Sequence, residues 1–343
     1  MDRTFSKELI IIGGGPAGLK AAEEAGHHKI DYIAFEKGNV GQAWREMRPE
    51  MFLLSPCHPQ RDWTSFSGKF PIWKMGVRRP YCQASEFVKY MDAYTDHFKL
   101  NIELNTSVTN INFNHDSLQY EVRVGDKTYT APVITVATGI FGNPFIPEIP
   151  GVKNNPIVTH SHHYRSAEEF KNKRVLIVGT GNSAAEIAID LCGHSLVYLI
   201  SRDDLKFFSD TKKLYHIRGI SESYLKELIS MEIIRYRAYQ NIQRIEGNRV
   251  YFRDWDMEVD KIIFATGYHP HIKVAQNFPL RFNRKNFPEV AYSGESIQQP
   301  GLFFAGPLAY QTSASIVVHG FVKLIPYTVN QIAERLKTSS TRR

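Results

Sequence analysis

Two stretches of this chain share one pattern, in which an apolar run leads through closely spaced glycines into a helical segment. The first is IIIGGGPAGLKAAEEA at residues 10–25, and the second is KRVLIVGTGNSAAEIAIDL at residues 173–191. A buried strand followed by a glycine turn and a helix is typical of a dinucleotide-binding unit. The chain has 343 residues, which is long enough for two such domains.

The first turn has the spacing GxGxxG, formed by Gly13, Gly15 and Gly18. We expect Gly13 to permit the tight turn, Gly15 to let backbone approach a pyrophosphate, and Gly18 to let the helix pack on the strand. The next predicted strand, 31–35, ends in Glu36, whose carboxylate can accept both hydroxyls of a ribose. Because that charge repels a 2′-phosphate, the pattern favours FAD or NAD over NADP.

The second turn carries Gly179 and Gly181, with the small Ala184 where a third glycine would stand. Its partner strand ends in Ser201 and Arg202, a hydroxyl and a cation that suit the 2′-phosphate of NADPH. The alternative for Arg202 is an ordinary solvated arginine. Opposite chemistry at the two ribose ends predicts two dinucleotides, a tightly held flavin (FAD) and a diffusible hydride donor (NADPH).

The remaining pattern predicts an α/β fold of two Rossmann-like domains, with the NADPH domain inserted into the FAD domain. Short alternating runs over 101–137 suggest a meander, and the proline-rich segment 142–151 indicates a hinge. The expected domains are a first part of the FAD domain at 1–150, an NADPH domain at 151–285, and a C-terminal part of the FAD domain at 286–343.

Two helical segments complete the prediction. Over 85–99, aromatic residues recur at helical spacing and predict a core-facing helix with Ser85 as its N-cap. After the apolar run GLFFAG, the pattern predicts a helix capped by Thr312 or Ser313 and kinked or ended at Pro326. A helix beginning there could direct its positive end toward a flavin ring.

The cysteines, Cys57, Cys82 and Cys192, stand far apart in the sequence, which predicts neither a redox dithiol nor a structural zinc site. His58, His160, His162 and His163 have no acidic or cysteine partner at ligand spacing, so we expect no metal. The aromatic segment with Trp44, Trp63, Phe66 and Trp73 lines the flavin or substrate, or packs in the core, with neither reading preferred.

Charge and hydropathy predict a cytoplasmic enzyme. The net charge of +7 is scattered along the chain, which favours a solvated surface over nucleic-acid binding. The apolar run near the N-terminus is too short for a signal peptide or a membrane span. We expect a small-molecule substrate as a partner, and the oligomeric state, a homodimer included, stays open.

The run HSHHYRSAEEFKNKRVLIVGTGNSAAEIAIDL, together with GGGPAG, GQAW, FSGKFP, VATG and FATGY, resembles the flavin-containing monooxygenases, including the plant auxin-forming ones. The architecture that this implies is shared with thioredoxin-reductase-like flavoproteins, which usually carry Asp where this chain has Asn182 before Ser183. The resemblance implies an NADPH-dependent FAD monooxygenase, with oxygen as a partner beside the small-molecule substrate. It would oxygenate a soft nitrogen or sulfur nucleophile, or a carbonyl carbon, through a C4a-hydroperoxyflavin, with Asn182 positioning NADP and flavin.

Several positions depart from that family. The family's fingerprint has Phe and Gly where this chain has Asn154 and Pro156, so only His160 and Tyr164 match it. Ser55 and Pro56 stand where many members place an Asn near the flavin.

The chain also resembles bacillithiol disulfide reductases, although these carry Cys where Ala17 stands. The alternative function is therefore an NADPH-dependent flavin reductase of a disulfide, quinone or protein electron carrier without its own dithiol. A redox-sensing binding protein without enzymatic activity is a third hypothesis. The residues expected to bind the cofactors are Gly13, Gly15, Pro16, Ala17, Gly18, Glu36, Lys37, Gln42, Trp44, Thr138, Gly139, Gly179, Gly181, Asn182, Ser183, Ser201, Arg202, Ala265, Thr266, Gly267, Gly306, Thr312 and Ser313.

Overall fold

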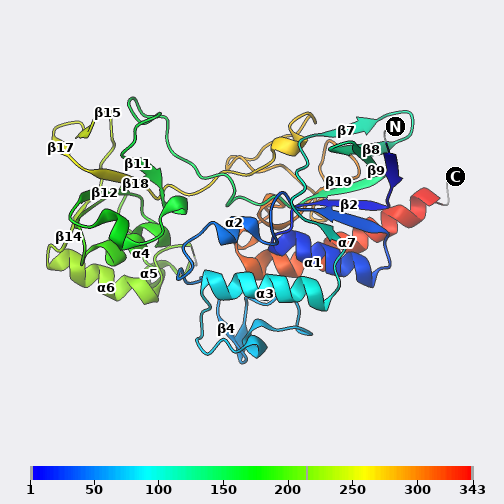
Figure 1. The fold of residues 1–343 in the computed structure, drawn as a ribbon, viewed down its shortest axis with the longest axis horizontal. Helices are drawn as coiled ribbons and strands as arrows, with labels where there is room; N and C mark the ends of the chain where they lie inside the picture. Colours follow the sequence, from blue (N-terminus) through cyan, green and yellow to red (C-terminus); the bar gives the residue numbers. More distant parts are fainter. Residues whose placement is uncertain (1–2, 214, 341–343) are drawn as a thin grey trace. The chain divides into compact units, whose positions relative to one another are not determined.

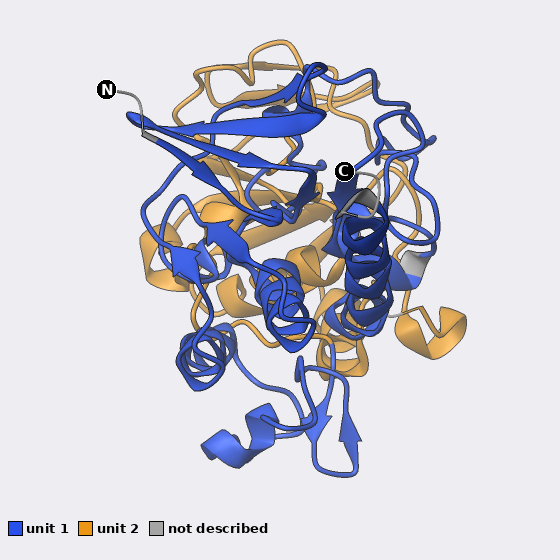
Figure 2. Ribbon diagram, turned by 90° about the vertical axis from the view of Figure 1, so that its right-hand side faces the viewer, with its two compact units in different colours: residues 1–45, 55–143, 269–343 blue, residues 46–54, 144–268 orange. Residues whose placement is uncertain are grey.

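The computed structural model describes residues 3–213 and 215–340, which form two compact units (Figures 1 and 2). Unit 1 takes its described residues from 1–45, 55–143 and 269–343, and unit 2 takes 46–54 and 144–268. Unit 2 is therefore inserted into unit 1, as the sequence predicts. The change of unit at 143/144 falls inside the proline-rich segment, whereas the predicted domain ends at 150 and 285 lie later in the chain. The short excursion 46–54 has no counterpart in the predicted domains.

A parallel sheet forms the centre of unit 1. Its strand order is β19-β10-β2-β3-β6. The bounds are β2 Leu9–Ile12, β3 Tyr32–Phe35, β6 Ile102–Glu103, β10 Val133–Val136 and β19 Leu302–Phe304. Because β19 pairs in parallel with β10, the C-terminal part of the chain returns to the first sheet.

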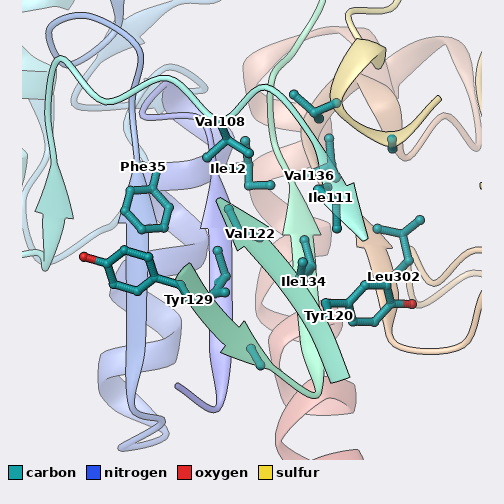
Figure 3. Close-up of a cluster of buried hydrophobic side chains, with 14 of the residues drawn as sticks. Ile12, Phe35, Val108, Ile111, Tyr120, Val122, Tyr129, Ile134, Val136 and Leu302 are labelled. Carbon is teal, nitrogen blue, oxygen red and sulfur yellow. The ribbon is translucent and has the colours of Figure 1, made fainter. Parts of the chain in front are cut away.

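A mixed β-sheet layer covers one face of this sheet. Its strands, in the order β1-β9-β8-β7, are β1 Arg3–Ser6, β7 Ile111–Asn114, β8 Gln119–Val124 and β9 Lys127–Ala131. In this layer β1 pairs with β9 in parallel, and the other pairs are antiparallel. Figure 3 shows Ile12 and Val136 of the parallel sheet facing Tyr120 and Val122 of this layer across a buried core. The predicted meander over 101–137 is therefore right only for its middle, because β6 and β10 belong to the parallel sheet.

Helices pack on unit 1 away from that layer. They are α1 Pro16–His27, α2 Gln42–Arg45, α3 Ala84–His97 and α7 Val318–Ser340, and a small hairpin is formed by β4 Cys57–His58 and β5 Arg61–Asp62. Helices α1 and α7 lie side by side (Figure 1). The aromatic stripe of α3 is buried as predicted, with Phe87, Tyr90 and Tyr94 fully inside.

Two predicted details of the helix ends are wrong, and one of the two alternatives for Pro326 is excluded. Gln83 caps α3 in a capping box with Glu86, so Ser85 lies inside the helix. Thr312 does act as an N-cap, but of a short 3-10 turn at Ser313–Ile316, and α7 begins only at Val318. Pro326 lies inside α7 and does not end it.

Unit 2 repeats the same layering. Its parallel sheet, in the order β11-β18-β12-β13-β14, consists of β11 Val158–His160, β12 Arg174–Val178, β13 Leu196–Ile200, β14 Ile234–Arg237 and β18 Lys261–Phe264. One face packs against helices, and the other packs against an antiparallel sheet. The helices of unit 2 are α4 Asn182–Leu191, α5 Phe208–Thr211 and α6 Gly219–Ser230, and the antiparallel strands are β15 Arg244–Glu246, β16 Arg249–Tyr251 and β17 Asp256–Glu258. Among the helices in the described part of the chain, none combines the length and apolar character that a membrane crossing requires.

Candidate functional site

The first glycine turn joins β2 to α1 in unit 1, and each of its glycines meets a different environment. Gly13 has φ +115°, and a Cβ there would lie 2.5 Å from the carbonyl oxygen of Ala137. A Cβ on Gly18 would lie only 1.8 Å from the carbonyl oxygen of Gly13. A Cβ on Gly15 would meet nothing within 4 Å. The turn is thus closed at Gly13 and Gly18 and open at Gly15, which fits a bound pyrophosphate at the start of α1.

Glu36 at the end of β3 faces this turn. Its two carboxylate oxygens accept hydrogen bonds from the backbone N–H of Gly14 at 2.7 Å and of Gly38 at 3.0 Å. An ionised carboxylate has further lone pairs, so both oxygens can still accept hydroxyl donors. Glu36 is 7% exposed and held at a fixed place beside the turn. This arrangement suits the ribose of FAD or NAD and opposes a 2′-phosphate.

The residues that flank the first turn differ in their surroundings. Pro16 begins α1. Ala17 is buried, and a Cβ added to Gly306 would lie only 2.7 Å from the Cβ of Ala17. The side-chain oxygen of Gln42 accepts the backbone N–H of Asn39 at 3.0 Å. Lys37 is exposed.

The aromatic segment divides between core and half-buried positions. Trp44 is half-buried and meets the rings of Phe87 and Phe141 edge-on, with centroids 4.9 and 5.1 Å away. Phe66 is 2% exposed and packs against α3, which favours the core reading for this residue. Trp63 lies beside His319 near the start of α7, with ring centroids 4.9 Å apart.

The second glycine turn joins β12 to α4 in unit 2 and repeats the geometry of the first. Gly179 has φ +154°, and a Cβ there would lie 2.4 Å from the carbonyl oxygen of Ala265. A Cβ on Gly181 would meet nothing within 4 Å, and Ala184 is buried in the helix core. The second site is therefore also open at its middle glycine and fits a second dinucleotide.

Both turns contact an Ala-Thr-Gly segment that directly follows a strand, at 137–139 after β10 and at 265–267 after β18. The Thr138 hydroxyl donates to the carbonyl oxygen of His271, and the Thr266 hydroxyl donates to that of Phe145. Thr138 thus holds the segment by which the chain returns to unit 1, and Thr266 holds the segment by which the chain enters unit 2. Gly139 and Gly267 both have positive φ, at +68° and +84°.

Asn182 has a structural role that the sequence does not indicate. Its amide nitrogen donates to the carbonyl oxygens of His216 at 2.9 Å and Tyr215 at 3.3 Å. Its amide oxygen accepts the backbone N–H of Arg218 at 3.0 Å. The side chain therefore holds the loop that leads into α6. Ser183 beside it is half-buried.

Ser201 and Arg202, at the end of β13, differ in availability. Ser201 is 2% exposed, and its hydroxyl donates to the carbonyl oxygen of Asp203 and lies 2.8 Å from the Tyr236 hydroxyl. Arg202 is exposed and forms no ion pair with any other residue that the structure describes. Arg202 can therefore reach an anion, whereas Ser201 is already committed within the protein.

A cluster of charged groups surrounds Tyr164, one of the two residues that match the monooxygenase fingerprint. The Tyr164 hydroxyl donates to Asp190 at 2.6 Å, and the guanidinium of Arg48 lies 3.0 Å from the same carboxylate. Arg48 also lies 3.6 Å from Glu186. Burial raises the pKa of Glu186 to about 7, and Arg48 acts in the opposite direction. The cluster fastens the segment 46–54 to α4.

The other fingerprint residue, His160, is 1% exposed and fully hydrogen-bonded. Its Nδ1 accepts the backbone N–H of His162, so its Nε2 carries the hydrogen that reaches the carbonyl oxygen of Gly267 at 3.0 Å. Burial lowers the pKa of His160 to about 4, which keeps the ring neutral. His162 lies between the Tyr268 hydroxyl at 3.3 Å and Glu46 at 3.4 Å. Sequence reasoning missed Glu46 and Arg48, because neither stands in a recognisable motif.

The fold brings together an acidic group with a histidine, and a pair of cysteines, that sequence patterns do not indicate. Among the described residues, the group close enough to share an ion is Glu23, Glu24 and His27, none of which the sequence singled out. The Lys20 ammonium lies 2.6 Å from a carboxylate oxygen of both Glu23 and Glu24, so this group already contains a cation. The expectation of no redox dithiol rests on the distance between the cysteines in the sequence, and the fold removes that ground for one pair. Cys57 and Cys82 lie in the same unit, and their thiols are within interaction range of each other.

Comparison with known families identifies the chain. Residues 10–306 match the family model described as pyridine nucleotide-disulphide oxidoreductase. This chain belongs to that family. The match runs from the first glycine turn to Gly306 and includes both turns, so membership of the oxidoreductase family agrees with the predicted fold and class.

Relatives of known sequence include two monooxygenases. The probable indole-3-pyruvate monooxygenase YUCCA1 of Arabidopsis thaliana is 31% identical over 195 residues, which cover 54% of this chain and 44% of that protein. The trimethylamine monooxygenase of Pelagibacter ubique (strain HTCC1002) is 25% identical over 336 residues, covering 84% of this chain and 67% of that protein. The chain thus spans about half the length of the plant relatives that it matches.

Solved structures share the fold. The bacillithiol disulfide reductase of Staphylococcus aureus has a TM-score of 0.84 at 22% identity, and the flavin-containing monooxygenase of Stenotrophomonas maltophilia has 0.83 at 21%. Each comparison covers 96% of this chain and 99% of the other. This member of the oxidoreductase family therefore resembles both predicted groups, and the fold alone does not separate them.

Proposed function

We propose that the chain is an NADPH-dependent FAD monooxygenase, with FAD at the β2–α1 turn and NADPH at the β12–α4 turn. The observation that carries this proposal is the contrast between two turns of equal geometry. Glu36 faces the first turn, whereas Arg202 follows the strand beside the second. A carboxylate suits an unmodified ribose, and a free guanidinium suits a 2′-phosphate.

The chain's own residues then have separate roles. The open positions at Gly15 and Gly181 admit a pyrophosphate to the N-termini of α1 and α4, whose free N–H groups and dipoles favour phosphate. Glu36 accepts the ribose hydroxyls of FAD, and Arg202 pairs with the 2′-phosphate of NADPH. Ser201 orients the loop that carries Arg202 by donating to the carbonyl oxygen of Asp203.

The remaining predicted contacts stay part of this proposal. They lie at the start of α1, along the segment after β3, at the two Ala-Thr-Gly strand ends and near the start of α7. They are Pro16, Ala17, Lys37, Gln42, Trp44, Thr138, Gly139, Ser183, Ala265, Thr266, Gly267, Gly306, Thr312 and Ser313. Asn182 acts indirectly, because its amide holds the loop at 215–218.

When bound, NADPH would supply a hydride, and FAD would supply the group that takes it up and reacts with oxygen. The protein's share is to hold both cofactors and to exclude water from the reacting groups. We propose a small substrate with a soft nitrogen or sulfur nucleophile, or with a carbonyl carbon. The names of the two relatives, an amine monooxygenase and an oxo-acid monooxygenase, support this range.

The experiment is a measurement of the purified protein's bound flavin, its anaerobic reduction by NADPH, and oxygen-dependent product formation with trimethylamine and a thioether. We expect FAD to be present, NADPH to reduce it, and product to form with less hydrogen peroxide released than NADPH consumed. Faster NADPH turnover with a disulfide or quinone in the absence of oxygen would favour the reductase alternative. Ala17 provides no thiol in the first turn for that chemistry.

A further inference from the structure

Cys57 and Cys82 are brought together by the backbone, although 24 residues (58–81) separate them in the sequence. The backbone N–H of Cys57, on β4, donates to the carbonyl oxygen of Pro80 at 2.8 Å. The Cys57 Sγ lies 3.4 Å from the carbonyl oxygen of Arg79 and 3.5 Å from that of Pro80. Cys82 follows two residues after Pro80, and its thiol lies within hydrogen-bonding reach of the Cys57 thiol.

Both cysteines of the pair are buried. Cys57 is 1% exposed and Cys82 is fully buried. Arg79 and Pro80, whose carbonyl oxygens lie next to the Cys57 sulfur, are themselves exposed. This burial favours a small oxidant over a bulky disulfide as the reagent for the pair. Cys192, in unit 2, donates its S–H to the carbonyl oxygen of Ile189 at 3.0 Å and has no thiol partner among the described residues.

The two thiols are chemically unequal. Hydrogen bonding from Cys82 is the largest effect on Cys57 and lowers the pKa of the Cys57 thiol, although burial opposes it. The same interaction, with burial, raises the pKa of the Cys82 thiol. The lowered pKa of Cys57 favours it as the thiol that is oxidised first, and Cys82 is then the thiol that resolves the product.

We propose that Cys57 and Cys82 form a dithiol that hydrogen peroxide oxidises to a disulfide. The Cys57 thiolate attacks one peroxide oxygen, the O–O bond breaks, and the other oxygen leaves as hydroxide and takes up a proton to become water. The Cys82 sulfur then attacks the resulting sulfenic acid and expels a second water. Two thiols lose two electrons and two protons, and one peroxide is reduced to two waters.

The disulfide would fix a defined part of unit 1. It links β4 to the residue just before the Gln83 cap of α3 and closes the intervening segment into a loop. That segment is already held at one point, because the Tyr90 hydroxyl accepts the N–H of Phe66 at 2.8 Å and donates to the carbonyl oxygen of Phe70 at 3.0 Å. We expect oxidation to raise the melting temperature of the protein by restricting the unfolded chain.

This inference goes beyond the proposed function and does not depend on it, because the test uses added peroxide and a mass measurement. The reduced flavin-loaded protein is treated with hydrogen peroxide, quenched, and analysed as intact protein and as tryptic peptides. We expect a mass loss of about 2 Da, reversed by dithiothreitol, and a link between the peptides that contain Cys57 and Cys82. Arg61 and Lys69 lie between the two cysteines, so trypsin separates the peptides unless they are joined.

The variants separate the roles of the cysteines. Cys192→Ser is the matched control and should still lose about 2 Da. Cys82→Ser should instead gain about 16 Da at Cys57, because no resolving thiol remains. A wild-type protein that gains oxygen atoms without a link, stays unoxidised, or links through Cys192 would overturn the proposal. Formation of a mixed disulfide with oxidised glutathione in the native protein would overturn the assignment of peroxide as the oxidant. The wild-type measurement stands even if a variant fails to fold.

Discussion

Arg202→Ala tests the cofactor assignment of unit 2. Arg202 is exposed, so its contact with a 2′-phosphate would be a charge-assisted interaction in water, worth about 1.5–3 kcal/mol. That range corresponds to a loss of about 10-fold to 150-fold in affinity. Because Asp203 and Asp204 remain beside the site and repel phosphate, we expect the upper half of this range for NADPH. NADH has no 2′-phosphate, so its affinity should change by less than about 2-fold.

The assay is anaerobic stopped-flow reduction of the bound flavin at increasing NADPH or NADH, which gives an apparent Kd for each. Arg253→Ala is the matched control, because Arg253 lies in the same unit with 90% of its side chain exposed and only a 3.9 Å contact with Asp254. This control removes the same charge and should leave both affinities unchanged. Equal losses for NADPH and NADH in Arg202→Ala, or an equal loss in Arg253→Ala, would refute a specific phosphate contact.

Three further predictions concern the glycine turn, a buried ion pair and a buried histidine. Gly15→Ala should fold but bind flavin about 10-fold more weakly or worse, because its methyl group enters the open position. Gly18→Ala should instead unfold the turn, because its methyl group would collide with the backbone of Gly13. Flavin content and circular dichroism distinguish these outcomes. Lys20→Met should lower the free energy of unfolding in urea by about 3–5 kcal/mol, because the buried Glu23 carboxylate loses its ammonium partner and keeps only the Tyr94 hydroxyl and His27, whose Nε2 lies 4.0 Å away. The exposed pair of Lys7 with Asp31 provides the control, since Lys7→Met should lose no more than about 1 kcal/mol. The pKa of His160 is about 4 in the folded protein and 6.5 in the unfolded chain. As the pH falls from 6.5 to 4, the unfolded chain binds a proton that the folded protein does not, so the free energy of unfolding should fall by up to about 3 kcal/mol. His160→Gln should flatten that slope in urea titrations at several pH values; an unchanged slope would contradict the buried, neutral ring.

Local sequence patterns predict most of the strands and helices of the fold. The strand at Leu9–Ile12 and the helix after Gly15 follow from an unbroken apolar run and a glycine turn. The meander is predicted too broadly, because a short alternating strand carries no sign of which sheet it will join. Similarly, Ser85 is a good capping residue in isolation, but Gln83 caps α3 because Glu86 completes the capping box from inside the helix.

Within the candidate site, the backbone geometry at the turns agrees with the sequence patterns, whereas contacts between distant segments have no sign in the sequence. The two glycine turns and Glu36 can be recognised from the spacing of their residues in the sequence. Arg48, by contrast, reaches Asp190 across 141 intervening positions (49–189), and no local pattern indicates that pairing. The proximity of Cys57 to Cys82 likewise depends on a backbone hydrogen bond to Pro80. Ser201 was predicted as a phosphate contact from its position, yet its hydroxyl bonds within the protein.

We propose that the chain would hold an NADPH-reducible flavin through which oxygen is transferred to a substrate. The most direct measurement is stopped-flow mixing of the anaerobically NADPH-reduced protein with oxygenated buffer, followed by full absorbance spectra. We expect two phases. Between them, a transient species should absorb to the blue of oxidised flavin, with a spectrum that matches neither reduced nor oxidised flavin. Direct, single-phase return to oxidised flavin, with one hydrogen peroxide released for each NADPH consumed, would contradict the monooxygenase account.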